Sequence, residues 1–210
     1  MIDELDFEQS SVESPESLLC KELLGKDYEE NPADVLRTMM SDRKSVSEQY
    51  GIPLIESSES PNEYCKKLVG IAEEKGVVTV YVDQKSLNKA NVAAGYTSSG
   101  KLVLPKINFD TVTPVEARNW SIKMAHELIH AVQDKVNPSM PIERAEYEAY
   151  VMTYLPTAFA LAYNECQGVH NYLMYFRIVD NVLGLIKDSS LGNYKKRGVP
   201  ENSISWNKST

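Results

Sequence analysis

Hydrophobic and polar residues follow helical spacing over most of the chain. Apolar residues recur at every third or fourth position in runs near both ends, and a short strand-like interval separates these runs. Two of the runs follow a Ser-Pro or Thr-Pro pair, which is typical of a helix start. The pattern and composition together predict helices over 17–24, 33–51, 61–75, 113–135, 142–156 and 168–188.

The interval between these helices favours β-structure. Residues 77–84 (VVTVYVDQ) are rich in β-branched and aromatic side chains, as strands are. Residues 92–106 (VAAGYTSSGKLVLPK) place turn residues at 97–100 between two extended runs and predict a β-hairpin. The second arm, Lys101 to Pro105, ends in a proline and is expected at a sheet edge. We therefore expect an α+β fold with a small sheet.

The helix expected over 113–135 has the clearest start. Thr113 is a suitable N-cap, Pro114 fits the first turn, and Glu116 completes a Thr-x-x-Glu capping box. An Asn-Pro pair shortly after this stretch indicates its end. The sequence HELIH, residues 126–130, therefore lies in the middle of a helix and not in a loop.

HELIH combines residue types that suit metal chemistry. His126 and His130 are four residues apart, so on a helix they share a face and can bind one ion at about 2.0–2.1 Å. Glu127 lies about 100° further round the helix. There its carboxylate can take a proton from a metal-bound water, whose pKa zinc lowers toward about 7. HELIH thus predicts two ligands and a general base.

A catalytic zinc site needs a third protein ligand, and the helix expected over 142–156 offers three glutamates. Glu146 is favoured, because Ala149 three residues later leaves room for the opposing helix. Glu148 points to a different side and would be the ligand if the helix were rotated. Glu143 and the third histidine, His170, remain alternatives, and a solvated acidic face would explain these glutamates without a metal.

HELIH followed by the run Glu146-Tyr147-Glu148-Ala149 resembles the gluzincin branch of the zinc metallopeptidases. The likeness covers roughly residues 77–156 and implies a zincin-like mixed sheet with an edge hairpin, packed on the HExxH helix and the helices that follow it. The resemblance implies a Zn²⁺ ion held by His126, His130 and Glu146, with Glu127 as catalytic base. It also implies a protein or peptide substrate bound in extended form along the 92–106 hairpin.

Small bacterial metallopeptidases that cut repressor proteins are similar to this chain in size and in the run from Glu146 to Pro156. They usually carry Asn and Phe after the Glu-Ala pair, where this chain has Tyr150 and Met152. Tyr150 is expected to hydrogen-bond to a metal ligand and to belong to the catalytic group. The family commonly stabilises the oxyanion with Tyr or His from outside the two motif helices, which points to His170, although a packing or capping role suits His170 equally.

Acidic and basic residues are distributed unevenly along the chain. Residues 1–63 carry 16 acidic and 5 basic residues, whereas residues 64–210 carry 14 acidic and 17 basic residues. The acidic part argues against a nucleic-acid partner, and no apolar run is long enough for a membrane span. We expect a disordered acidic tail (1–17), a helical extension (18–63), the metallopeptidase domain (64–190) and an irregular tail (191–210).

The acidic start lacks the features of a signal peptide, and the three cysteines form no CxxC pair. We expect a cytoplasmic protein, or one secreted without a signal peptide; the sequence predicts no oligomeric state. The predicted function is zinc-dependent endopeptidase activity. The alternatives are an inactive zincin-like binding or regulatory protein, an interaction module with structural histidines, and a bacterial effector protease that acts on a host protein.

Overall fold

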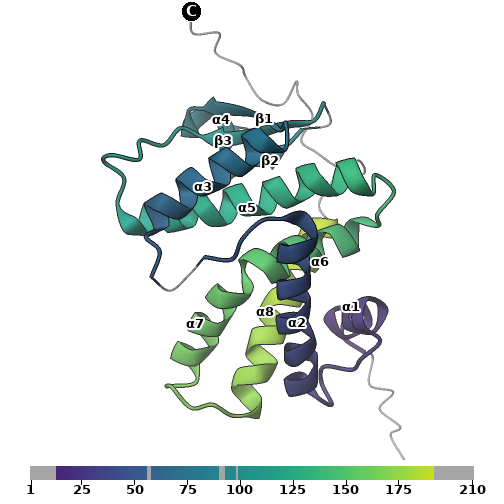
Figure 1. Ribbon diagram of the computed structural model, residues 1–210. Helices are drawn as coiled ribbons and strands as arrows, with labels where there is room; N and C mark the ends of the chain where they lie inside the picture. Colours follow the sequence, from purple (N-terminus) through teal and green to yellow (C-terminus); the bar gives the residue numbers. More distant parts are fainter. Residues whose placement is uncertain (1–12, 56–57, 90–92, 98, 192–210) are drawn as a thin grey trace, which may run out of the picture.

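The computed structural model describes residues 13–55, 58–89, 93–97 and 99–191. These residues form eight helices and a three-stranded sheet, which confirms the α+β class. In chain order the elements are α1 (Pro15–Leu24), α2 (Pro32–Tyr50), α3 (Pro61–Glu74), β1 (Val78–Val82), α4 (Gln84–Lys89), β2 (Gly95–Tyr96), β3 (Lys101–Pro105), α5 (Pro114–Val136), α6 (Ile142–Thr153), α7 (Leu155–Glu165) and α8 (Tyr172–Leu191). In Figure 1 the sheet, α3 and α5 form one half of the molecule, and α1, α2, α6, α7 and α8 form the other.

The sheet is mixed, with the strand order β1-β3-β2. Strand β1 pairs with β3 in parallel, and β2 and β3 form the expected antiparallel hairpin. The expectation that Lys101–Pro105 lies at an edge is wrong, because β3 is the central strand. Both faces of β3 are covered: Leu102 and Leu104 join the cluster with α5, while Val103 packs with Val82 and Leu87. Pro105 is tolerated because it is the last residue of the strand.

Helix α5 lies on the side of its half that faces the other half of the molecule (Figure 1). Its buried face, which includes Met124, Leu128 and Ile129, packs against the sheet and α3 in one hydrophobic cluster. Helix α6 contributes to both halves: Ala149 and Met152 belong to the α5 cluster, whereas Tyr147 and Val151 belong to the second cluster, formed by α1, α2, α6, α7 and α8. This division of its faces fixes which side chains of α6 meet α5.

The segment expected as a helical extension shares its core with the later helices. Tyr28 donates a hydrogen bond to Asp180 of α8 (3.2 Å), and Tyr147 of α6 donates one to Asp42 of α2 (2.7 Å). Helix α1 begins at Pro15, with Ser14 as its N-cap, so its first turn lies within the stretch expected to be a tail. The rest of that tail, residues 1–12, and residues 192–210 of the C-terminal tail lie outside the described residues.

The sequence pattern did not predict α4 and α7. The sequence predicts that Pro156 ends the preceding helix, but Pro156 occupies the first turn of α7, where a missing N–H costs nothing. Tyr154 separates α6 from α7 without a loop. As a result α7 follows α6 directly, and residues of α5, α6 and α7 line a groove between these helices.

Candidate metal centre

Helix α5 presents the two histidines of HELIH toward α6. The helix starts as predicted, with a complete capping box between Thr113 and Glu116 and with Pro114 in its first turn. It ends at Val136, so HELIH lies in its second half, surrounded by buried apolar positions. Because those apolar side chains hold the opposite face against the sheet, the histidine face is directed to α6.

Helix α6 supplies the third member of the site. His126 Nε2 lies 3.1 Å from His130 Nε2. The two carboxylate oxygens of Glu146 lie close to these nitrogens: Oε2 is 3.4 Å from His126 Nε2, and Oε1 is 3.4 Å from His130 Nε2. A four-coordinate ion with ligands at about 2.0–2.1 Å holds its donor atoms about 3.3 Å apart. We call these three residues the His-Glu cluster. Its spacing matches that of ligands around one ion, so the cluster can hold a metal ion.

The cluster is partly open to solvent. The side chains of His126, His130 and Glu146 are between 13% and 16% exposed. The two imidazole rings meet edge to face, with centroids 4.8 Å apart, so both Nε2 atoms can approach a shared point.

The charges within the cluster are strongly coupled. Burial disfavours the charged form of His130, but the hydrogen bond and charge of Glu146, together with the charge of Glu127, raise its pKa to about 9. Burial also acts to raise the pKa of Glu146, yet hydrogen bonds from both histidines hold it well below its usual value. A site this negative attracts positive charge, and a divalent cation can take the place of a proton between the three side chains.

Glu148, the alternative ligand, lies outside the cluster and is only 3% exposed. Its carboxylate accepts hydrogen bonds from Tyr50, from Gln133 Nε2 (2.9 Å) and from Arg144 Nε (3.0 Å). These contacts direct it toward α2 and the end of α5, outside the His-Glu cluster. The preference for Glu146 is therefore supported, and Glu143 does not join the cluster either.

Gln133 connects Glu148 to the cluster. The Gln133 Oε1 atom lies 2.9 Å from His130 Nδ1, and its Nε2 donates both to Glu148 and to the Ala145 carbonyl (3.2 Å). Since Oε1 can only accept, His130 carries a proton on Nδ1, and Nε2 is the nitrogen that a metal ion can bind in place of a proton. Sequence reasoning missed Gln133, although its place three residues after His130 on the same helix face was a usable signal.

Glu127 stands beside the cluster without belonging to it. The side chain is half-buried, and no described residue makes a hydrogen bond or ion pair with its carboxylate. Its charge contributes to the raised pKa of His130, which is consistent with a position close to the histidines. An unpaired carboxylate at that position can exchange a proton with a molecule bound at the cluster.

Tyr150 reaches the cluster in a different way from the one expected. Its ring contacts the His126 ring edge to face, with centroids 4.6 Å apart, but its hydroxyl group pairs with Ser189 of α8 (2.7 Å). The predicted hydrogen bond to a ligand is therefore wrong, because Ser189 satisfies the hydroxyl. Burial raises the pKa of Tyr150, and the charges of Glu146 and Glu127 add to this effect. Tyr150 is thus a packing partner of His126.

The structure does not bring His170 to the cluster. His170 is exposed in the connection between α7 and α8, and its ring contacts Tyr163 with centroids 5.5 Å apart. Figure 1 shows that this connection lies at the end of α7 and α8 that is remote from α5. A role for His170 in stabilising an oxyanion does not fit this position, and the packing alternative does.

Comparison of the chain with protein-family models, curated proteins and solved structures finds no match. No helix in the described part of the chain has the length and hydrophobicity required to cross a bilayer. Inferences about function therefore rest on the site itself.

Proposed function

We propose that the protein is a zinc-dependent endopeptidase. The observation that carries this proposal is the His-Glu cluster with a free Glu127 carboxylate beside it. Two imidazoles and one carboxylate are the donor set typical of catalytic zinc in peptidases, and three protein ligands leave one position for water or substrate. A structural zinc site, by contrast, usually has four protein ligands.

In this proposal His126, His130 and Glu146 hold the ion, and Gln133 orients His130. Zinc held there would polarise a peptide carbonyl and would make a bound water molecule acidic enough to lose a proton near neutral pH. Glu127 accepts the proton of the attacking water and then delivers it to the leaving amine nitrogen. Cleavage of the peptide carbon–nitrogen bond consumes one water molecule. Its hydroxyl group becomes part of the new carboxyl end, and its proton goes to the new amine.

The sheet order supports a place for an extended substrate. Strand β2 (Gly95–Tyr96) pairs with β3 on one side and forms an edge of the sheet among the described residues. Main-chain groups of an edge strand can pair with an incoming peptide. The proposed substrate is therefore a protein segment in extended form along the 92–106 hairpin, with residues 92 and 98 outside the described part.

The test is hydrolysis of a mixed peptide library by the purified protein after it has been loaded with zinc. We expect new amino termini, detected by mass spectrometry, to accumulate with zinc, to vanish after phenanthroline treatment and to return when zinc is restored. Cleavage that persists in metal-free protein, or a zinc-loaded protein that cuts no peptide of the library, would contradict the proposal.

A further inference from the structure

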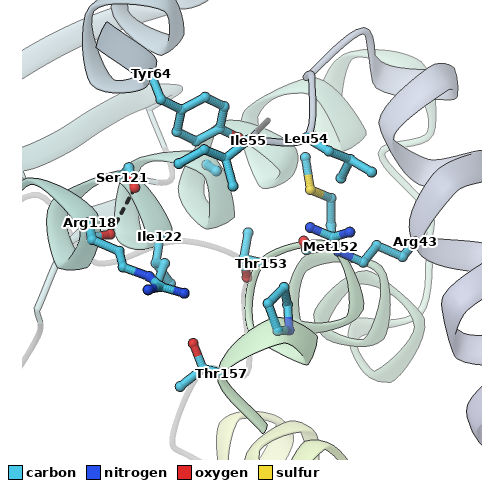
Figure 2. Close-up of a pocket in the computed structure, with 12 residues that line it drawn as sticks. Arg43, Leu54, Ile55, Tyr64, Arg118, Ser121, Ile122, Met152, Thr153 and Thr157 are labelled. Atoms are coloured by element: carbon cyan, nitrogen blue, oxygen red, sulfur yellow. Dashed lines mark hydrogen bonds between the residues drawn. The ribbon is translucent and has the colours of Figure 1, made fainter. Parts of the chain in front are cut away.

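A pocket lies in the groove next to the His-Glu cluster. It is formed where α5 faces the junction of α6 and α7, and α2 and the segment after α2 close it (Figure 2). Its lining residues are Arg43, Leu54, Ile55, Tyr64, Arg118, Ser121, Ile122, Ala125, Met152, Thr153, Pro156 and Thr157. None of these described lining residues is acidic. We call this space the arginine pocket.

The pocket is within reach of a peptide bound at the metal position. Ile122 lies one helical turn before His126, which is about 6 Å along α5, and Ala125 directly precedes His126. Helix α6 runs in the opposite direction, because Gln133 near the end of α5 contacts Ala145, whereas the earlier His126 contacts the later Tyr150. Thr153, one turn further along α6, therefore lies toward Ile122. One extended residue spans about 3.3–3.6 Å, so the side chain one or two residues from the scissile bond can enter the pocket.

Two cationic groups face this space without a carboxylate partner. Arg43 is half-buried; its Nε donates to the Met152 carbonyl (3.1 Å), which fixes the side chain and leaves the terminal nitrogens available. Neither Arg43 nor Arg118 forms an ion pair with a described residue. Burial lowers the pKa of Arg43, against a smaller effect of Tyr64. Figure 2 shows the two guanidinium groups directed from opposite sides toward the space around Thr153.

The remaining lining matches a short aliphatic stem. Leu54, Ile55, Ile122 and Met152 provide apolar surface between the two arginines. Guanidinium groups bind carboxylates through paired, charge-assisted hydrogen bonds, and a partly desolvated guanidinium gains most from such a partner. The pocket therefore suits a ligand group that has methylene groups and a terminal carboxylate.

We propose that the arginine pocket binds a carboxylate of the substrate and selects an acidic side chain, Glu or Asp, close to the scissile bond. This inference rests on the proposed peptidase function. The same carboxylate chemistry could also come from the C-terminus of a peptide, so the experiment includes both sources.

The test measures binding without cleavage, in zinc-loaded Glu127→Gln protein. Short acetylated and amidated peptides carry one Glu at each successive position of an uncharged sequence, and each has a partner with Gln at that position. A third set has Gln there and a free C-terminal carboxylate. We expect at least one Glu peptide to bind about tenfold more tightly than its Gln partner by calorimetry. Tighter binding of the third set than of the Glu peptides would mean that the pocket binds the C-terminal carboxylate of a peptide and not an acidic side chain.

Arg118→Gln should abolish most of this preference, because it removes one of the two guanidinium groups that face the pocket. Arg118 is exposed on α5, so its replacement does not disturb the core. Arg37→Gln is the matched control, since it removes an exposed arginine from α2 outside the pocket and should leave the preference unchanged. Equal binding of all Glu, Gln and free-acid peptides, or no peptide binding, would overturn the arginine pocket. If the Glu preference depends on Arg118 but the wild-type protein cuts no peptide, the arginine pocket is supported and only the proposed peptidase function is contradicted.

Discussion

Replacing Glu127 with Gln should lower kcat for peptide hydrolysis by about 10²–10⁴-fold and leave zinc bound. The amide has nearly the same size as the carboxylate but cannot accept the proton of the attacking water. Glu127 lies outside the His-Glu cluster, so the three ligand atoms keep their spacing in the variant. The measurement is kcat on a peptide cut by the wild-type protein, together with the zinc content of the same samples.

The matched control is Glu143→Gln, which changes a half-buried glutamate in the first turn of α6 that is also outside the cluster. It should retain both activity and zinc. An active Glu127→Gln protein would contradict the role of Glu127 as the base. Loss of zinc from that variant would instead mean that Glu127 contributes to metal binding, which the present geometry does not support.

Replacing Glu148 with Ala should lower the free energy of unfolding by about 3 kcal/mol, as removal of one partner from a buried charge pair does. The substitution leaves the buried hydroxyl of Tyr50 without its acceptor and removes one of the two acceptors of the Gln133 amide nitrogen. Arg144 is 39% exposed and regains water, so we expect the lower end of the usual range. Denaturant unfolding of the metal-free protein measures this effect.

The same substitution should also weaken zinc binding by about 10–100-fold, because Gln133 then no longer holds His130 in a fixed orientation. Glu148→Gln should lose less stability than Glu148→Ala, since the Gln side chain still accepts one hydrogen bond. Glu143→Ala, on the same helix, should change neither property. A stability loss below about 1 kcal/mol in Glu148→Ala, typical of an exposed ion pair, would contradict a structural role for this network.

Local sequence signals predicted the parts of the molecule that depend on neighbouring residues. The capping box at Thr113 and the spacing of His126 and His130 are properties of one helix, and both are confirmed. The choice of Glu146 over Glu148 followed from helix periodicity once Ala149 was expected to face α5. These features need no knowledge of distant parts of the chain.

Features that depend on tertiary contacts could not be predicted in this way. The hydroxyl of Tyr150 is taken by Ser189, thirty-nine residues later, so no local pattern indicated that it would turn from the metal. Strand β3 is central because β1 as well as β2 pairs with it, and α4, an unpredicted helix, covers its second face. Arg43 reaches the groove from α2, which the sequence assigned to a separate extension. In each case a partner remote in sequence decides the position.

The most direct test of the central claim is the metal content of the purified protein after zinc is supplied, measured by plasma mass spectrometry beside the Glu146→Ala and Glu143→Ala variants. The His-Glu cluster predicts about one zinc per chain in the wild-type protein and in Glu143→Ala, and a loss of zinc in Glu146→Ala. A wild-type protein that binds no zinc, or a Glu146→Ala variant that retains it, would contradict the metal centre.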